Sequence, residues 1–282
     1  MEEVQEKISH HNKSFWNELC GTNFAKELGI TKIDAESLQQ FDQAFFKLYP
    51  YLKPYLDSLD LESKKVVEIG LGFGTVAQYL VEKKAFYTGV DISPGPVEMA
   101  NYRIHNTGLT HTSKAIVASA LQLPFNTGTM DQIVSIGCLH HTGDLKLAIQ
   151  ECIRVLKPGG KLFIMIYNKY SLRSLMAPVY FGGARIITIF NRGLKVPSDY
   201  NGFVRWLRDH NTEGDAAPFT EFTALSDIPT LFEGAHINSQ RLHNLGKFQI
   251  PFTKIKLRKY FLGWLDRLVG LDIYIIATKN TE

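Results

Sequence analysis

Residues 64–75 of the chain read KKVVEIGLGFGT, and this stretch decides the fold. Residues 66–69 predict a short buried strand, because an apolar, β-branched segment that ends in glycines is typical of a parallel sheet covered on both faces. Gly70, Gly72 and Gly74 follow at alternate positions, where the missing Cβ atoms allow a sharp turn and the close approach of a ligand. A helix is expected to begin at about Thr75. The stretch therefore predicts a strand–turn–helix unit that holds a ligand at its turn.

A second strand, predicted over residues 86–90, ends in an acid, Asp91, seventeen residues after Gly74. An acid at this place can accept both hydroxyls of a ribose that lies beside the glycine turn. Glu68 would repel a phosphate but suits a ligand with an amino group. The glycine spacing is G-x-G-x-G, with Thr75 where the dinucleotide motif G-x-G-x-x-G has its third glycine. These residues indicate a nucleoside-bearing cofactor. Because the spacing departs from the dinucleotide motif, a dehydrogenase is the least favoured class of enzyme.

The pattern EIGxGxGT, followed by GVDIS at residues 89–93, resembles the class I S-adenosylmethionine (SAM) dependent methyltransferases of the small-molecule type. The resemblance implies that Gly70, Gly72 and Gly74 hold the aminocarboxypropyl arm and the adjacent ribose. It also implies that Glu68 orients the turn or receives the amino group.

Two further parts of the cofactor site follow from the same resemblance. Asp91 is expected to accept the ribose hydroxyls, and the following Ile92 is included among the cofactor-binding residues. Residues 119–125, SALQLPF, resemble the family loop D-A-x-x-L-P-F that flanks the adenine. Ser119 stands where the family often has Asp, so the adenine contact is expected to depend on Ser119 and on the backbone of Ala120 and Leu121.

Strand and helix patterns alternate regularly from residue 66 to about 171, which predicts a doubly wound, mostly parallel α/β sheet. With the resemblance, the expectation is a seven-stranded, Rossmann-like methyltransferase fold whose last strand, over residues 271–278, is antiparallel. Ser93 is predicted to cap the second helix and Pro94 to open it. The run RVLKPGG at residues 154–160 resembles the family's turn into strand five and is assigned no chemistry.

Two helical or irregular segments are expected to cover this sheet. Residues 1–62 predict a helical N-terminal lid or cap, whose aromatic side chains pack on the sheet or close over cofactor and substrate. Residues 63–282 form the predicted SAM-binding methyltransferase domain. Prolines and glycines interrupt the alternation at about 171–225, which predicts an inserted substrate cap. Candidates for substrate contact there and at the end of strand five are Tyr167, Arg173, Tyr180, Arg205, Arg208 and His210.

The fourth strand is followed by GCLHHT at residues 137–142, a loop that faces the methyl group if the resemblance holds. The candidates for a general base are His140, His141, Tyr167 and His210. The alternative for the adjacent histidines is that one packs and caps while the other is solvated. No metal is predicted, because adjacent histidines without carboxylate or cysteine partners make a poor ligand set. No (Asn/Asp/Ser)-Pro-Pro-(Tyr/Phe) run is present, which disfavours methylation of exocyclic amines in nucleic acid.

The composition of the chain further restricts the class of protein. The 282 residues carry a net charge of +3, too mild to predict nucleic-acid binding. Three cysteines without ligand spacing fit a reducing cytoplasm and argue against disulfides and zinc. The polar N-terminus predicts no signal peptide, and no apolar run reaches the ~18 residues of a spanning helix. Residues 254–268 predict an amphipathic helix on the sheet edge, with contact to a membrane surface as the alternative.

The sequence therefore predicts a soluble, cytoplasmic enzyme that transfers a methyl group from SAM to a small molecule. Two alternatives stay open: a SAM-using cyclase or lyase of the same fold that releases methylthioadenosine, and a non-catalytic SAM-binding protein. The acceptor, its reacting atom and the oligomeric state cannot be read from the residues.

Overall fold

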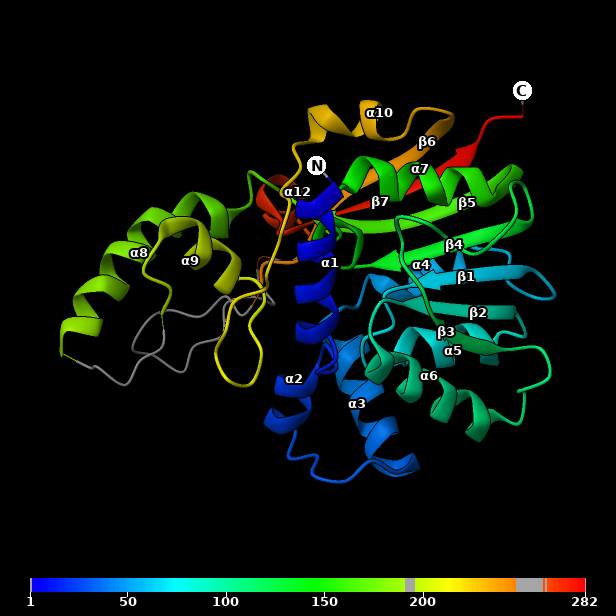
Figure 1. Ribbon diagram of the computed structural model, residues 1–282, viewed down its shortest axis with the longest axis horizontal. Helices are drawn as coiled ribbons and strands as arrows, with labels where there is room; N and C mark the ends of the chain where they lie inside the picture. The colour runs from blue at the N-terminus through cyan, green and yellow to red at the C-terminus, as the bar shows by residue number, and fades with distance from the viewer. Residues whose placement is uncertain (1, 191–195, 247–260, 262, 282) are drawn as a thin grey trace.

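The computed structural model describes residues 2–190, 196–246, 261 and 263–281. Its centre is a seven-stranded sheet in the order β3-β2-β1-β4-β5-β7-β6, in which β7 runs antiparallel to both of its neighbours. The strands are β1 Lys65–Ile69, β2 Phe86–Asp91, β3 Lys114–Val117, β4 Met130–Ile136, β5 Leu156–Tyr167, β6 Ala235–His243 and β7 Asp272–Lys279. The predicted doubly wound, mostly parallel fold is confirmed (Figure 1).

Helices cover both faces of the sheet, and the strand residues divide between the two layers by their alternation. Val67 and Ile69 of β1 pack in one core cluster with α7 (Leu145–Val155) and α10 (Ile228–Leu231). Val66 points to the other face and packs with α4 (Leu52–Asp57), α5 (Thr75–Glu82) and α6 (Pro94–Thr107). The site therefore stands on a three-layer core whose central strands are buried on both sides.

The N-terminal residues form α1 (Glu2–Phe15), α2 (Thr22–Glu27), α3 (Ala35–Leu48) and α4. In Figure 1, α1 crosses the sheet at the carboxyl ends of the parallel strands. Its side chains bond to the loops there: Gln5 Nε2 donates to the Thr142 carbonyl at 2.6 Å, and Asn12 Nδ2 to the His141 carbonyl at 2.6 Å. The loop after β2 is held as well, because Ser93 Oγ donates to the Lys13 carbonyl at 3.0 Å.

A buried ion pair joins α3 to the sheet-covering helices. Arg103 of α6 is fully buried and donates to both carboxylate oxygens of Asp42 at 2.9 and 3.0 Å. Gln78 Oε1 accepts from the same guanidinium at 2.7 Å, and Thr75 Oγ1 donates to Asp42 at 2.6 Å. The aliphatic part of Arg103 also fills the space beside Gly74, where a Cβ would lie 2.7 Å from its Cδ. Gly74, at φ +75°, is thus required by this packing.

Several local predictions need correction. Asp144 caps α7 as an acceptor for the Leu147 N–H, but Ser93 makes no side-chain cap, because its hydroxyl bonds to α1 instead. Strand five begins at Leu156, within the run at residues 154–160 that was expected to form the turn, and its pairing with β4 has an irregular register. Before β6 the chain forms a 3₁₀ turn at Leu225–Asp227 followed by α10.

The insert is more regular than the sequence predicts. It contains α8 (Leu172–Phe190), which continues through Pro178 and two glycines, and α9 (Tyr200–Trp206). Packing between these helices opposes the roughly 3 kcal/mol cost of an interior proline. Phe181 of α8 contacts Tyr200 and Phe203, with ring centroids 5.6 and 5.2 Å apart.

Most of the amphipathic helix expected over residues 254–268 lies outside the described residues; its described end is α12 (Asp266–Val269). Among the described residues, no helix combines the length and apolar character needed to cross a membrane.

We expect Arg103→Ala to lower the free energy of unfolding by about 3–5 kcal/mol, because it leaves Asp42 as a largely buried charge without its partner. Urea unfolding followed by circular dichroism measures this. Lys146→Ala is the control, since its ion pair with Glu233 is half exposed and its loss is expected to cost less than about 1 kcal/mol. Equal effects of the two substitutions would contradict the assignment of Arg103 as the main tie between α3 and α6.

Candidate cofactor and acceptor site

A cavity of about 440 Å³ lies at the carboxyl ends of the parallel strands, under the N-terminal helices. This is where ligands bind in doubly wound sheets, and the volume is in the range of small-molecule sites. Its walls come from the loops after β1, β2, β3 and β4, from α1 and α3, and from the segment after α9. The aromatic part of the lining consists of Phe15, Trp16, Phe24, Phe41, Phe45, Phe73 and Tyr49.

The Asp91 carboxylate, at the tip of β2, fixes the glycine turn. Its Oδ2 accepts from the Leu71 N–H and its Oδ1 from the Ser93 N–H, both at 2.9 Å. Each oxygen keeps a second lone pair, so both can still accept a hydroxyl of a ribose. Burial raises the pKa of Asp91, and the backbone hydrogen bonds oppose this rise. The carboxylate lines the cavity with Ile92 beside it.

Glu68 lies deep in the same cavity and is nearly fully buried. Burial raises the pKa of Glu68 to about 8, although the Tyr87 hydroxyl donates to its Oε2 at 2.6 Å and works against the shift. At neutral pH this carboxyl group is therefore mostly protonated, and a cationic amino group placed against it would favour the ionised form.

The three glycines of the turn have different surroundings. Gly70 and Gly72 line the cavity, whereas Gly74 does not and lies against Arg103. A Cβ on Gly70 would come within 2.3 Å of the Cys138 Cβ, so the turn is packed tightly against the loop after β4.

The loop after β3 forms the wall expected to meet the adenine. Ser119, Ala120 and Leu121 all line the cavity. Ser119 Oγ accepts from the Leu121 N–H at 3.2 Å, which orders the loop and leaves the hydroxyl hydrogen able to donate to a ligand. The residues predicted to hold SAM, other than Gly74, are thus brought around one cavity, and their chemistry fits an adenosyl ligand with an amino group.

The two adjacent histidines have unlike positions. His140 does not line the cavity; its ring is fully buried against Tyr167, with centroids 4.0 Å apart, and within the described chain neither ring nitrogen has a hydrogen-bond partner. Burial, followed by the neighbouring His141, lowers the pKa of His140 well below its usual range. It is therefore a neutral packing residue in this structure.

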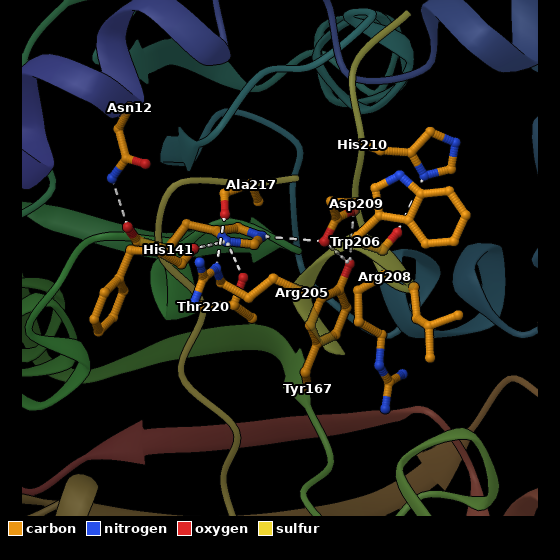
Figure 2. Close-up of polar contacts among 12 residues, drawn as sticks. Asn12, His141, Tyr167, Arg205, Trp206, Arg208, Asp209, His210, Ala217 and Thr220 are labelled. Atoms are coloured by element: carbon orange, nitrogen blue, oxygen red, sulfur yellow. Dashed lines mark hydrogen bonds and ion pairs between the residues drawn. The ribbon is translucent and has the colours of Figure 1, made fainter. Parts of the chain in front are cut away.

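His141 lines the cavity and is held in one tautomer. Its Nδ1 lies 2.7 Å from the Phe219 carbonyl oxygen, an acceptor only, so Nδ1 carries the hydrogen and Nε2 the lone pair. Nε2 lies 3.6 Å from Asp209 Oδ2. Figure 2 marks this contact with a dashed line. Burial lowers the pKa of His141, while Asp209 raises it in part. The Trp16 ring covers the imidazole at 4.7 Å between centroids.

Asp209 is a residue of the cavity wall that the sequence analysis did not single out. It follows α9, lines the cavity and accepts from the Tyr167 hydroxyl at 2.9 and 3.1 Å. Tyr167 itself does not line the cavity, and burial raises its pKa well above the usual range, so its hydroxyl acts as a donor that orients Asp209. Only the cluster of polar residues after α9 could have drawn attention to Asp209 in the sequence.

The remaining candidates lie at the rim or away from it. His210 is exposed at the cavity edge and stacks on Trp206, with ring centroids 5.3 Å apart (Figure 2). Arg208 also lines the cavity, and burial lowers its pKa to about 10. Arg173 and Arg205 instead donate to the carbonyls of Leu207 and Ala217, and neither these two nor Tyr180 line the cavity. Across the described residues, no group of three or more His, Cys, Asp or Glu is arranged to hold a metal ion.

Part of the chain is similar to known methyltransferases. Residues 67–164, from β1 into β5, match the family model described as "Methyltransferase domain". The ubiquinone biosynthesis O-methyltransferase of Pseudomonas aeruginosa is 27% identical over 161 residues, which cover 54% of this chain and 66% of that protein. The protein of the same name from Vibrio cholerae is 31% identical over 147 residues, covering 51% and 57%. The aligned part of this chain thus spans 66% or less of these relatives.

A solved structure of a SAM-dependent methyltransferase from Methanosarcina mazei has a TM-score of 0.54 and 20% identity, covering 81% of this chain and 98% of that one. At this identity the likeness concerns the fold. The chain thus contains a methyltransferase domain over residues 67–164 and has the fold of class I SAM-dependent methyltransferases, and the cavity around Asp91 fits SAM as the cofactor.

Proposed function

We propose that this protein transfers the methyl group of SAM to a phenolic hydroxyl of a small-molecule acceptor. The observation that carries the proposal is the His141–Asp209 pair, which stands in the wall of the cavity that holds the predicted cofactor residues. The relatives named ubiquinone biosynthesis O-methyltransferase support the choice of oxygen as the acceptor atom. The aromatic lining supports a planar acceptor, since aromatic rings pack favourably against one another.

SAM supplies a methyl group on a sulfonium, which is already a good leaving group. The chain then has two tasks: to hold the acceptor oxygen in line with that methyl group, and to take up the hydroxyl proton. His141 is neutral before the reaction because burial disfavours its charged form. After it accepts the proton, the imidazolium lies next to the Asp209 carboxylate, which stabilises it. The products are a methyl ether, S-adenosylhomocysteine and a proton held by the pair.

Tyr167 and the Phe219 carbonyl position the two members of this pair. The carbonyl keeps hydrogen on Nδ1 of His141, and the Tyr167 hydroxyl holds Asp209. Trp16 and Phe15 close the cavity from the N-terminal side, which supports the predicted role of residues 1–62 as a lid that excludes water.

We expect Asp91→Ala to weaken S-adenosylhomocysteine binding by roughly 10–100-fold, because hydrogen bonds to a charged acceptor contribute about 1.5–3 kcal/mol. Titration calorimetry measures this. Binding to the unaltered protein should weaken as the pH falls through the raised pKa of Asp91, since a protonated carboxyl loses acceptor capacity. Undiminished binding by a folded Asp91→Ala protein would exclude the ribose contact. Asp131→Ala, at the opposite end of β4, is the control.

Glu68 allows a test of how the amino group is bound. If the ammonium group of SAM contacts Glu68, binding near pH 7 should release a large part of one proton, because the free carboxyl has a pKa of about 8. Calorimetry in buffers of different ionisation enthalpy counts the released protons, and Glu68→Gln should abolish the release. Binding without proton release would assign Glu68 to orienting the turn alone.

We expect His141→Gln to lower kcat by about 10²–10⁴-fold toward a phenolic acceptor, because it removes the proton acceptor. In the unaltered protein, kcat should fall as the pH drops through the lowered pKa of His141. In Asp209→Asn the fall of kcat should occur at lower pH, because the Asp209 carboxylate raises the pKa of His141 in the unaltered protein. S-adenosylhomocysteine formed from a panel of phenols and catechols is the readout, and the exposed His105→Gln is the control.

Unchanged kcat in His141→Gln, with cofactor binding intact, would contradict the proposed base. Methylthioadenosine in place of S-adenosylhomocysteine would contradict methyl transfer itself.

A further inference from the structure

Helix α8 presents an apolar face to solvent. Leu175, Val179 and Ile186 are 57%, 65% and 60% exposed. Their spacing of four and seven residues places them on one side of the helix. Pro178 and Tyr180 are exposed next to them, and Gly182 and Gly183 add no polar side chain to this side. A helix on the surface of a soluble domain usually shows its charged side to water, so the polarity of α8 is inverted.

Helix α8 nevertheless packs against the protein on its other side. Ala177, on the side opposite to Val179, is 1% exposed, and Phe181 packs against the aromatic side chains of α9. Figure 1 shows α8 and α9 together at the outer edge of the molecule, away from the sheet. The apolar stripe of Leu175, Val179 and Ile186 is thus held outward by a helix that is anchored on its other side.

Helix α8 itself carries two charged residues, Arg173 and Arg185, and both are positive; the next acid along the chain is Asp199, at the N-cap of α9. From residue 171 to residue 198 the sequence contains Arg173, Arg185, Arg192 and Lys195 but no Asp or Glu. Arg185 is exposed on α8, while Arg173 donates to the Leu207 carbonyl near the helix start. Arg192 and Lys195 lie outside the described residues and count here only by their place in the chain. An apolar stripe combined with positive charge complements a surface that has an anionic outer layer and an apolar layer beneath it, as a lipid bilayer has.

We propose that α8 docks on the surface of a lipid bilayer that contains anionic lipids, with Leu175, Val179 and Ile186 inserted between the acyl chains. The helix lies in the interface and does not span it, since it carries two arginines and does not qualify as a membrane-crossing helix. The proposal is independent of the methyl-transfer chemistry, because none of these three side chains lines the cavity. It assigns membrane contact to the insert, a different segment from residues 254–268.

Sedimentation of the full chain with lipid vesicles tests this surface. We expect binding to vesicles of roughly 3:1 phosphatidylcholine and phosphatidylglycerol, and weaker binding to phosphatidylcholine alone. Val179→Asp and Ile186→Asp should each lower the partition coefficient about tenfold or more, because a charge replaces a buried apolar side chain. Raising the salt from about 0.1 to about 1 M should weaken binding, since it screens the attraction.

Leu147→Asp is the matched control, because Leu147 is a 44% exposed apolar residue on α7, and its substitution should leave vesicle binding unchanged. S-adenosylhomocysteine binding, measured on every variant, confirms that the fold is intact. The absence of binding to anionic vesicles would overturn the proposal, as would equal binding by the α8 variants. A dimer in solution that Val179→Asp dissociates would also overturn it, and would assign the stripe to a second copy of this chain.

Discussion

The hydrogen bond from the Leu71 N–H to the Asp91 carboxylate is the contact on which the site depends. It joins the glycine turn after β1 to the tip of β2, and the Ser93 N–H bonds to the other carboxylate oxygen. Both bonds offset part of the cost of burying the charge. Both bonds are made by groups of the chain itself, and they leave each carboxylate oxygen of Asp91 a second lone pair that can accept a ribose hydroxyl.

The N-terminal helices depend on the same edge of the sheet. Ser93 bonds to α1, Asn12 and Gln5 bond to the loop after β4, and the Arg103–Asp42 pair ties α3 to α6. These contacts join residues far apart in the sequence, yet all of them end on loops that also line the cavity or on the helices next to it. The N-terminal helices that cover the cavity are therefore held by the loops that line it.

Local spacing allowed the sheet, the glycine turn and Asp91 to be predicted from the sequence, because each follows from neighbouring residues. The errors concern contacts between distant segments. Ser93 was expected to cap its own helix, but α1 offers its hydroxyl a carbonyl from eighty residues earlier. Gly74 packs against Arg103, a side chain from α6, and does not line the cavity. Asp209 could not be found, since neither a motif nor a period connects the segment after α9 with His141.

His140 and His141 show how the environment separates two identical side chains. Both are buried, and burial lowers both pKa values, so desolvation alone gives them the same neutral state. Only His141 has a carbonyl on Nδ1 and a carboxylate near Nε2, and only His141 lines the cavity. A proton taken up by His140 would have no partner in the described chain, whereas one taken up by His141 meets Asp209. The positions of Asp209 and Phe219, which come after α9, therefore decide which of the two histidines can act as the proposed base. The GCLHHT run by itself does not distinguish them.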